Sequence, residues 1–323
     1  MNGTSYTIDI SDAGSRLDAL LADKVDGWSR SRLQRLIENG DALVNGREVK
    51  PSYKVREGDE IDLDLTEAPT ARFEAENIPL DIVFEDDYLA VINKPAGMIV
   101  HPGAGVPNGT LANALAFRFG VAGSEMDGED EQSKIQNLKS KIGIVHRLDK
   151  DTSGLIVVAK DEQTHEALGE QFRLREVFKS YVALVHGNPR DNSGTIDRPI
   201  ARDRFQRTKM TVSGTGRHAL SFWKVRERFE KFTLVDIEIK TGRTHQIRVH
   251  LASINHPVVG DSTYNEGRDN TIADQEIKKA VEKLGRFFLH AEKLSITHPK
   301  TGERLEFNCP MPVELARLLD QIR

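Results

Sequence analysis

Apolar residues of this chain recur at helical spacing near its start and in short continuous runs further along. Helical spacing appears twice between residues 15 and 65, at Leu17, Leu20, Leu21 and Val25 and again at Leu33, Leu36 and Ile37. Asn39-Gly40 is expected to stop the second helix, and Asn45-Gly46 predicts a tight hairpin turn. The pattern predicts a small α/β domain over residues 15–65, a linker over 66–78 and a larger domain over 79–323.

The larger domain contains a series of apolar and β-branched runs that are typical of buried strands. Two of them, Ile142–Val145 and Leu155–Ala159, enclose a charged loop, and Val91–Gly103 predicts a strand, a Pro-Gly turn and a second strand. Phe178–Val185 predicts a further strand. Val235–Leu251 predicts a strand, a glycine turn and a helix capped by Thr244.

The charged loop, residues 146–154, is the first place to look for chemistry. Asp149 lies there between Arg147 and Lys150, and nearby cations favour the ionised form of a carboxylic acid. A carboxylate in a loop held by two strands can act as a nucleophile, a base or an electrostatic stabiliser. The sequence leaves the choice among these roles open.

Composition limits the classes of protein that fit. The chain has 323 residues, 38% of them hydrophobic, and no apolar run approaches the roughly 18 residues that span a bilayer. Its polar first residues lack the apolar stretch of a signal peptide, so a cytosolic protein is expected. Its single cysteine, Cys309, excludes an internal disulfide and a cysteine-based zinc site and is interpreted as a packing residue.

Charge is unevenly distributed, although the net charge of -5 argues mildly against indiscriminate binding of nucleic acid. Acidic residues gather at 125–136, in a stretch that indicates an exposed insert. Basic residues gather on a segment with little apolar periodicity, which predicts a solvent-facing loop or hairpin: Arg198, Arg202, Arg204, Arg207, Lys209 and Arg217. That stripe either binds phosphates or is an ordinary solvated surface.

Two side chains elsewhere have an ordinary and a functional interpretation. A tyrosine such as Tyr181 in a strand is most often a packing residue. Arg248 flanks the apolar face of its predicted helix, where an arginine usually extends to solvent, but its planar guanidinium is also suited to an inward pair with a carboxylate. His245 and His250 lack the spacing and the acidic companions of a metal site, so we expect no bound metal.

Four motifs together resemble the RluA family of pseudouridine synthases. They are Asn93–Gly97, His146–Gly154, Lys179–Tyr181 and Gly242–His250, in the same order and separation, with further matches at His256–Asp261 and Phe288–Ala291. Residues 101–105 are most similar to the RluD branch, which modifies large-subunit ribosomal RNA. The segment from Ser15 resembles the small RNA-binding module named after the fourth protein of the small ribosomal subunit. Residues 125–136 and 265–283 depart from the family pattern and are expected to be surface elaborations.

This resemblance implies an α+β fold with a mixed, largely antiparallel catalytic sheet and a reaction that isomerises uridine to pseudouridine without a cofactor. It implies that Asp149 is the nucleophile or stabiliser, that Arg248 pairs with it, and that Tyr181 stacks on the uracil and assists removal of the C5 proton. Arg147 would assist base flipping. The other expected substrate contacts are His146, Lys179, Arg202, Arg207, Lys209, Arg243, His245, Gln246, Arg30, Arg32 and Arg35.

The partner implied is large-subunit ribosomal RNA, with a pre-ribosomal particle as a further possibility, and the expected form is a monomer that does not bind membranes. Two alternatives belong to other classes. A phosphotransferase is suggested by His146–Asp149, but the sequence has no glycine-rich nucleotide loop or Asp-Phe-Gly motif. A non-catalytic ribosome-assembly factor would bind RNA without isomerising uridine, and the intact set of Asp149, Tyr181 and Arg248 argues against it.

Overall fold

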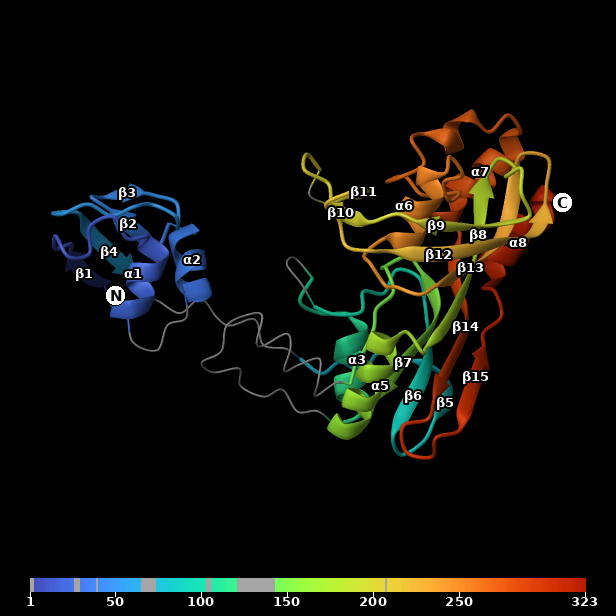
Figure 1. Cartoon of the computed structure of the whole chain (residues 1–323), viewed down its shortest axis with the longest axis horizontal. Helices are drawn as coiled ribbons and strands as arrows, with labels where there is room; N and C mark the ends of the chain where they lie inside the picture. The colour runs from blue at the N-terminus through green and yellow to red at the C-terminus, as the bar shows by residue number, and fades with distance from the viewer. Residues whose placement is uncertain are drawn as a thin grey trace. The chain divides into compact units, whose positions relative to one another are not determined.

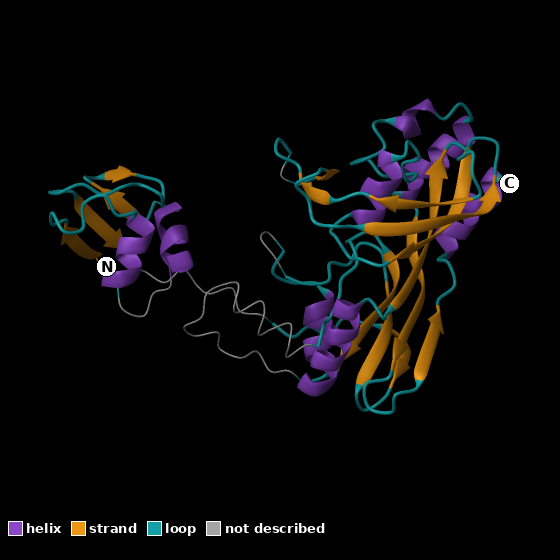
Figure 2. Cartoon of the chain, in the orientation of Figure 1, coloured by secondary structure: helices purple, strands orange, loops and turns teal. Residues whose placement is uncertain are grey.

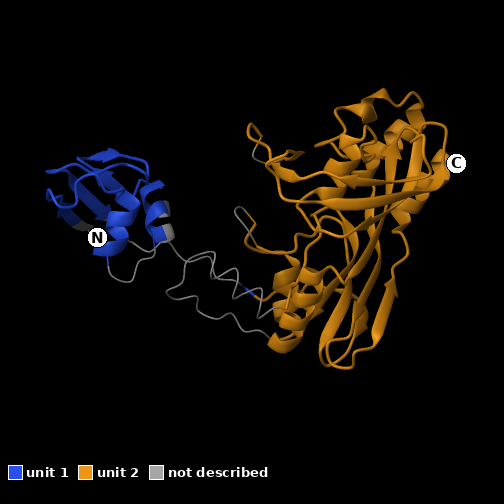
Figure 3. Cartoon of the chain, in the orientation of Figure 1, with its two compact units in different colours: residues 1–74, 122–139 blue, residues 75–121, 140–323 orange. Residues whose placement is uncertain are grey.

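The computed structural model describes residues 3–25, 30–38, 40–64, 74–102, 106–120, 143–206 and 208–323. They form two compact units, coloured separately in Figure 3, one within residues 1–74 and the other over 75–121 and 140–323. The acidic stretch at 125–136 lies outside the described residues, as does most of the linker predicted at 66–78. No described helix is long and apolar enough to cross a membrane.

The smaller unit packs two helices, α1 (Leu17–Lys24) and α2 (Arg30–Glu38), beside a sheet of short strands. Its strands are β1 (Gly3–Thr7), β2 (Ala42–Val44), β3 (Arg47–Glu48) and β4 (Glu60–Asp64), in the spatial order β1-β4-β2-β3. Asn45 and Gly46 both have positive φ angles, which confirms the tight turn between β2 and β3. Strand β1 precedes the predicted start at residue 15 and belongs to the same unit, because it pairs with β4.

The larger unit is built on a mixed sheet that is antiparallel except where β14 (Leu289–Thr297) runs parallel to β7 (Ser153–Ala159). Figure 1 shows the long central strands β8 (Phe178–His186), β13 (Phe232–Ile239) and β14 side by side. The remaining strands of the sheet are β5 (Asp81–Glu85), β6 (Leu89–Lys94), β9 (Ser193–Asp197), β12 (Leu220–Arg228) and β15 (Arg304–Asn308). The α+β fold with a largely antiparallel sheet is confirmed.

Helices and one small hairpin complete this unit, and Figure 2 shows the helices at the flanks of the long strands. The helices are α3 (Leu111–Arg118), α5 (Glu162–Leu174), α6 (Gln246–Ser253), the short 3₁₀ helix η1 (Arg268–Thr271), α7 (Gln275–Leu284) and α8 (Val313–Ile322). The hairpin pairs β10 (Ile200–Arg202) with β11 (Met210–Val212), as expected for the basic segment. The segment from Glu76 belongs to this unit because its backbone N–H donates to the Asn113 carbonyl at 3.0 Å.

Strands β7 and β8 appear where apolar runs predicted them, but two other predicted strands do not form. Residues 143–145 contribute one isolated bridge, between Ile144 and Val158. Gly143 has a φ of +71°, and a Cβ there would lie 1.8 Å from the Ala159 carbonyl oxygen, so the chain turns where a strand was expected. After the turn at Gly97, residues 98–102 are irregular, so the second strand predicted there is also wrong.

Cys309 is buried in the hydrophobic cluster beneath β7 and β14, as its interpretation as a packing residue requires.

Candidate active site

The loop that carries Asp149 is held from beneath by a buried lysine. Lys94, at the end of β6, is 0% exposed, and its ammonium donates to the carbonyls of Pro95 at 2.7 Å, Met98 at 2.8 Å and Lys150 at 3.1 Å. Burial lowers the pKa of Lys94 to about 7. Three carbonyl acceptors match the three donors of an ammonium group, which favours the charged form. Lys94 therefore ties the Pro95–Met98 turn to the Asp149 loop.

Replacement of Lys94 by methionine should loosen this attachment. The change keeps an unbranched side chain but leaves three carbonyls without a donor, so we expect the free energy of unfolding to fall by about 2–4 kcal/mol at roughly 1 kcal/mol per hydrogen bond. Turnover should fall with it, because the Asp149 loop loses its anchor. Urea unfolding measures the first effect. Lys150→Met, in an exposed lysine of the same loop, should change stability by less than about 0.5 kcal/mol; equal stability of wild type and Lys94→Met would contradict the assignment.

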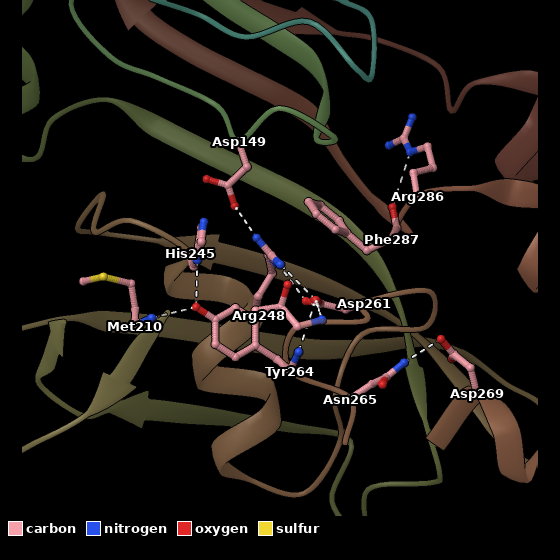
Figure 4. Close-up of polar contacts among 11 residues, drawn as sticks. Asp149, Met210, His245, Arg248, Asp261, Tyr264, Asn265, Asp269, Arg286 and Phe287 are labelled. Atoms are coloured by element: carbon pink, nitrogen blue, oxygen red, sulfur yellow. Dashed lines mark hydrogen bonds and ion pairs between the residues drawn. The ribbon is translucent and has the colours of Figure 1, made fainter. Parts of the chain in front are cut away.

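Arg248 turns inward from α6 and lies between two carboxylates. It is 5% exposed, and its Nη1 donates to Asp149 Oδ2 at 3.3 Å. Its Nε and Nη2 donate to the two carboxylate oxygens of Asp261, at 2.7 and 2.9 Å. Figure 4 shows this chain of contacts. Burial works to lower the pKa of Arg248, but the two carboxylates outweigh it and the pKa is raised.

Two aromatic rings fix the plane of that guanidinium. The Arg248 Cζ lies 4.9 Å from the centre of the Tyr264 ring and 4.3 Å from the centre of the Phe287 ring. A guanidinium stacked on rings and bound by a bidentate carboxylate has little freedom to rotate. Its third nitrogen, Nη1, is thereby directed at Asp149.

Asp261 is the functional residue that the sequence analysis did not assign. It is 1% exposed, and its Oδ1 also accepts the backbone N–H of Thr263 at 3.1 Å. Gly260 before it has a φ of +80°, and a Cβ there would lie 2.4 Å from the Arg286 carbonyl oxygen, so only glycine fits. The available signal was a Gly-Asp pair directly after the apolar Val258 and Val259, within a noted match to the family pattern.

The segment after Asp261 supports the same loop. Asp269 accepts the Gly260 N–H at 3.2 Å and contacts His186 Nε2 at 2.7 Å, and Asn265 donates its amide N–H to Asp269. Asn265 is 2% exposed. Residues 265–283 contain η1 and most of α7. The expectation that this segment is a surface elaboration is wrong for its first residues, Asn265 to Asp269, which support the Gly260–Asp261 turn.

Tyr181 is brought to Asp149 and Arg248 by the central strand β8. It pairs with Ile237 of β13 and Ala291 of β14, is 6% exposed, and lines a cavity of about 60 Å³ together with Asp149 and Arg248. Burial and then the charge of Asp149 raise the pKa of Tyr181. The phenol therefore carries its proton at neutral pH.

A larger cavity, of about 440 Å³, adjoins the first and shares Arg147, Leu148, Asp149, His245 and Arg248 with it. Asp149 and Arg248 thus stand where the two cavities meet. The side chain of Arg147 is exposed and lines both. No ion pair joins Arg147 to Asp151, both of which the structure describes.

Of the other predicted substrate residues, His245 and Arg243 border the cavities. The Nδ1 of His245 contacts the Tyr264 hydroxyl at 2.7 Å, and desolvation lowers its pKa. Arg243 lines the smaller cavity while its Nε donates to the His218 carbonyl at 3.0 Å. Together with Arg147 they surround Asp149 with polar groups.

Three further predicted contacts are bonded or packed within the fold, and one of them, Gln246, also lines the smaller cavity. Gln246 is 3% exposed, and its amide bonds to Thr241, Arg243, Leu220 and Ser221. It does so at the start of α6, where Thr244 was expected as the cap. That expectation is wrong, because His245, with a φ of 56°, occupies the N-cap position, and its side chain makes no capping hydrogen bond to the helix. His146 and Lys179 both pack on the ring of Phe172 and line neither cavity.

None of the remaining predicted residues that the structure describes lines either cavity. Arg202 is exposed and Lys209 half-buried on the β10–β11 hairpin, and Arg207 lies outside the described residues. Arg30 belongs to the smaller unit. Arg32 and Arg35 lie in α2, but their side chains are outside the description. No group of three His, Cys, Asp or Glu side chains in the described ranges could hold a metal ion.

Comparison with known proteins assigns each of the two units to a family. Residues 88–253 match the RNA pseudouridylate synthase family, and residues 15–61 match the S4 domain. The uncharacterized RNA pseudouridine synthase YlyB of Bacillus subtilis is 39% identical over all of this chain and 99% of its own. The ribosomal large subunit pseudouridine synthase D of Salmonella typhimurium is 40% identical over 98% of this chain and 93% of its own. The structure of human RNA pseudouridylate synthase domain containing 1 matches 76% of this chain and 87% of its own, with a TM-score of 0.53 and 26% identity.

Proposed function

The chain belongs to the RNA pseudouridylate synthase family, and we propose that it isomerises uridines of large-subunit ribosomal RNA with Asp149, Tyr181 and Arg248 as its catalytic residues. One observation carries the assignment of the site. The carboxylate, the phenol and the guanidinium come from distant parts of the sequence and line one cavity. The choice of RNA rests on similarity to synthases named for the ribosomal large subunit.

The proposed reaction conserves every atom of the nucleotide. The bond from N1 of uracil to C1′ of ribose breaks, the base turns, a bond forms between C5 and C1′, and the C5 proton is removed while N1 gains one. No cofactor is needed for this balance. Breaking a glycosidic bond builds positive charge on the sugar, which an ionised carboxylate can stabilise or attack. We assign that role to Asp149, with Arg248 aiming it.

Base flipping must precede this chemistry, because a uridine stacked in its helix cannot enter the cavity that Asp149 lines. Arg147 is exposed at the junction of the two cavities, where its cation can occupy the place that the base leaves or hold a flanking phosphate. His245 and Arg243 line the space beside it. We propose these three residues as the contacts to the flipped nucleotide.

Tyr181→Phe should separate stacking from proton transfer. Because the Tyr181 pKa is raised, the hydroxyl is protonated at neutral pH and is a poor acceptor for the C5 proton. We expect Tyr181→Phe to lower turnover no more than about tenfold and Tyr181→Leu, which removes the ring, to lower it further. Tritium release from C5-labelled RNA measures both. A loss of 10²-fold or more in Tyr181→Phe, the size of a typical general acid–base contribution, would instead assign the proton transfer to its hydroxyl.

Binding of RNA is assigned to two basic surfaces. In the smaller unit, the Asp18 carboxylate is 0% exposed and holds Arg16 and Arg30, whose side chains are 46% and 50% exposed. This arrangement presents two oriented guanidiniums to phosphates. In the larger unit the β10–β11 hairpin presents Arg202, with Lys209 on its other arm. Action as a monomer, on a pre-ribosomal particle, is part of the same proposal.

Pseudouridine mapping tests the whole assignment. Large-subunit ribosomal RNA from cells with and without the gene should differ at specific uridines, and the wild-type chain should restore them. An unchanged map would contradict the proposed substrate. RNA affinity without any isomerisation by the purified chain would favour the non-catalytic assembly factor instead.

A further inference from the structure

The side chain of Asp203 holds the first part of the β10–β11 turn, residues 203–206, in one conformation. Asp203 Oδ1 accepts the backbone N–H groups of Phe205 and Gln206, both at 2.8 Å. The Asp203 N–H donates to the Lys209 carbonyl at 3.0 Å, which closes the turn at its base. These bonds make residues 203–206 a defined platform, and Figure 1 shows β10 and β11 projecting from the body of the larger unit.

That platform presents a phenyl ring to water. Phe205 is 95% exposed, more than any other large hydrophobic side chain among the described residues. Its neighbours Arg202 and Arg204 are exposed as well. An isolated ring between cations lacks the contiguous apolar area that a protein partner requires. It does match the way proteins hold unpaired bases, by stacking on an aromatic face while cations contact the phosphates.

The root of the hairpin keeps Phe205 near the larger cavity. The Met210 N–H donates to the Tyr264 hydroxyl at 2.8 Å, and the Tyr264 ring packs against Arg248 (Figure 4). Thr208 lines the larger cavity together with Asp149. Phe205 lies three positions before Thr208, so chain length keeps the two within about 10 Å.

We infer that Phe205 stacks on an unpaired base of the substrate RNA close to the target uridine. The inference rests on the proposed function and adds to it: the substrate is a loop or bulge in which a nucleotide near the target is free to leave its helix. The exposed arginines of the hairpin contact the backbone beside that base. Phe205 thus helps to select the site without touching the reacting atoms.

Affinity of the full chain for a short RNA hairpin that it modifies tests the stacking. Phe205→Ala should raise the Kd about 5- to 100-fold, the range for loss of one base–aromatic stack. Phe205→Trp should bind at least as well as wild type, whereas Phe205→Leu, apolar but without a π face, should resemble Phe205→Ala. Phe117→Ala, at a 51% exposed phenylalanine on α3, is the matched control and should bind normally.

Abasic substitutions along the RNA identify the stacked nucleotide. Removal of one particular base near the target should weaken binding of the RNA by the wild type. The same removal should not further weaken binding by Phe205→Ala. Additive losses at every position would overturn the inference, as would normal binding by Phe205→Ala or Phe205→Leu. A change of oligomeric mass in Phe205→Ala with unchanged RNA affinity would assign the ring to a protein contact. A wild-type chain that modifies no RNA would overturn the proposed function and this inference together, whereas normal turnover and binding in all Phe205 variants would reject only the stacking.

Discussion

We expect Asp149→Asn to abolish pseudouridine formation while leaving the fold and the affinity for RNA largely intact. The amide has nearly the same shape as the carboxylate, so the loop held by Lys94 has no reason to move. It carries no negative charge, however, and it is a poor nucleophile toward C1′ of the ribose. We expect turnover to fall at least about 10⁴-fold, in the range found when a catalytic nucleophile is removed. Tritium release from C5-labelled RNA measures the loss.

A neighbouring carboxylate provides the matched comparison for Asp149→Asn. Asp151 lies in the same loop and lines only the larger cavity, and no bond joins it to Arg248 among the described side chains. Asp151→Asn should keep turnover within about tenfold of wild type. Circular dichroism and RNA affinity of both variants should match the wild type. Turnover close to that of wild type in Asp149→Asn would reject Asp149 as the catalytic carboxylate.

Local patterns predicted those parts of the fold in which neighbouring residues determine the backbone. Helical spacing placed α1 and α2, the Asn45-Gly46 pair placed a turn, and continuous apolar runs placed β7 and β8. The same criterion was wrong before the catalytic loop. An apolar run there forms a single bridge, because Gly143 adopts a positive φ against the backbone of Ala159. A run of four residues contains no signal that distinguishes these outcomes.

The site shows a different limit, because its contacts are set by the tertiary structure. Asp149, Tyr181 and Arg248 were named together only through resemblance to a family, since nothing in their spacing predicts that β8 and α6 meet the loop. Asp261 stayed unassigned because its importance depends on Arg248 lying beside it. Lys94 is a lysine that is buried because three carbonyls converge on it, which the sequence does not reveal.

Gln246, at the start of α6, both lines the smaller cavity and holds the fold together. Gln246 lies in a motif rich in hydrogen-bonding groups and was expected to contact the substrate. Its amide also joins the start of α6 to Leu220 and Ser221 at the start of β12. This role is structural, yet it holds His245 and Arg248 in place. A polar motif in a sequence can therefore contain residues that position a site as well as residues that act in it.

Arg248→Met should remove both the contact that orients Asp149 and the positive charge that balances Asp261. Asp261 is 1% exposed in this pair, and it would be left as a buried carboxylate with only backbone N–H partners. Breaking a buried ion pair by removing one partner typically costs about 3–5 kcal/mol of stability. Turnover should fall on the order of 10²-fold or more, because misplacing a catalytic group by about 1 Å has an effect of that size.

A double variant separates these two effects of Arg248. In Arg248→Met/Asp261→Leu the buried pair is replaced by apolar groups, a change that is often neutral or stabilising. We therefore expect the free energy of unfolding, measured in urea, to recover most of what Arg248→Met loses. Turnover should stay as low as in Arg248→Met, since nothing then directs Asp149. Recovery of turnover along with stability would mean that Arg248 acts only through the fold, and the positioning role would have to be abandoned.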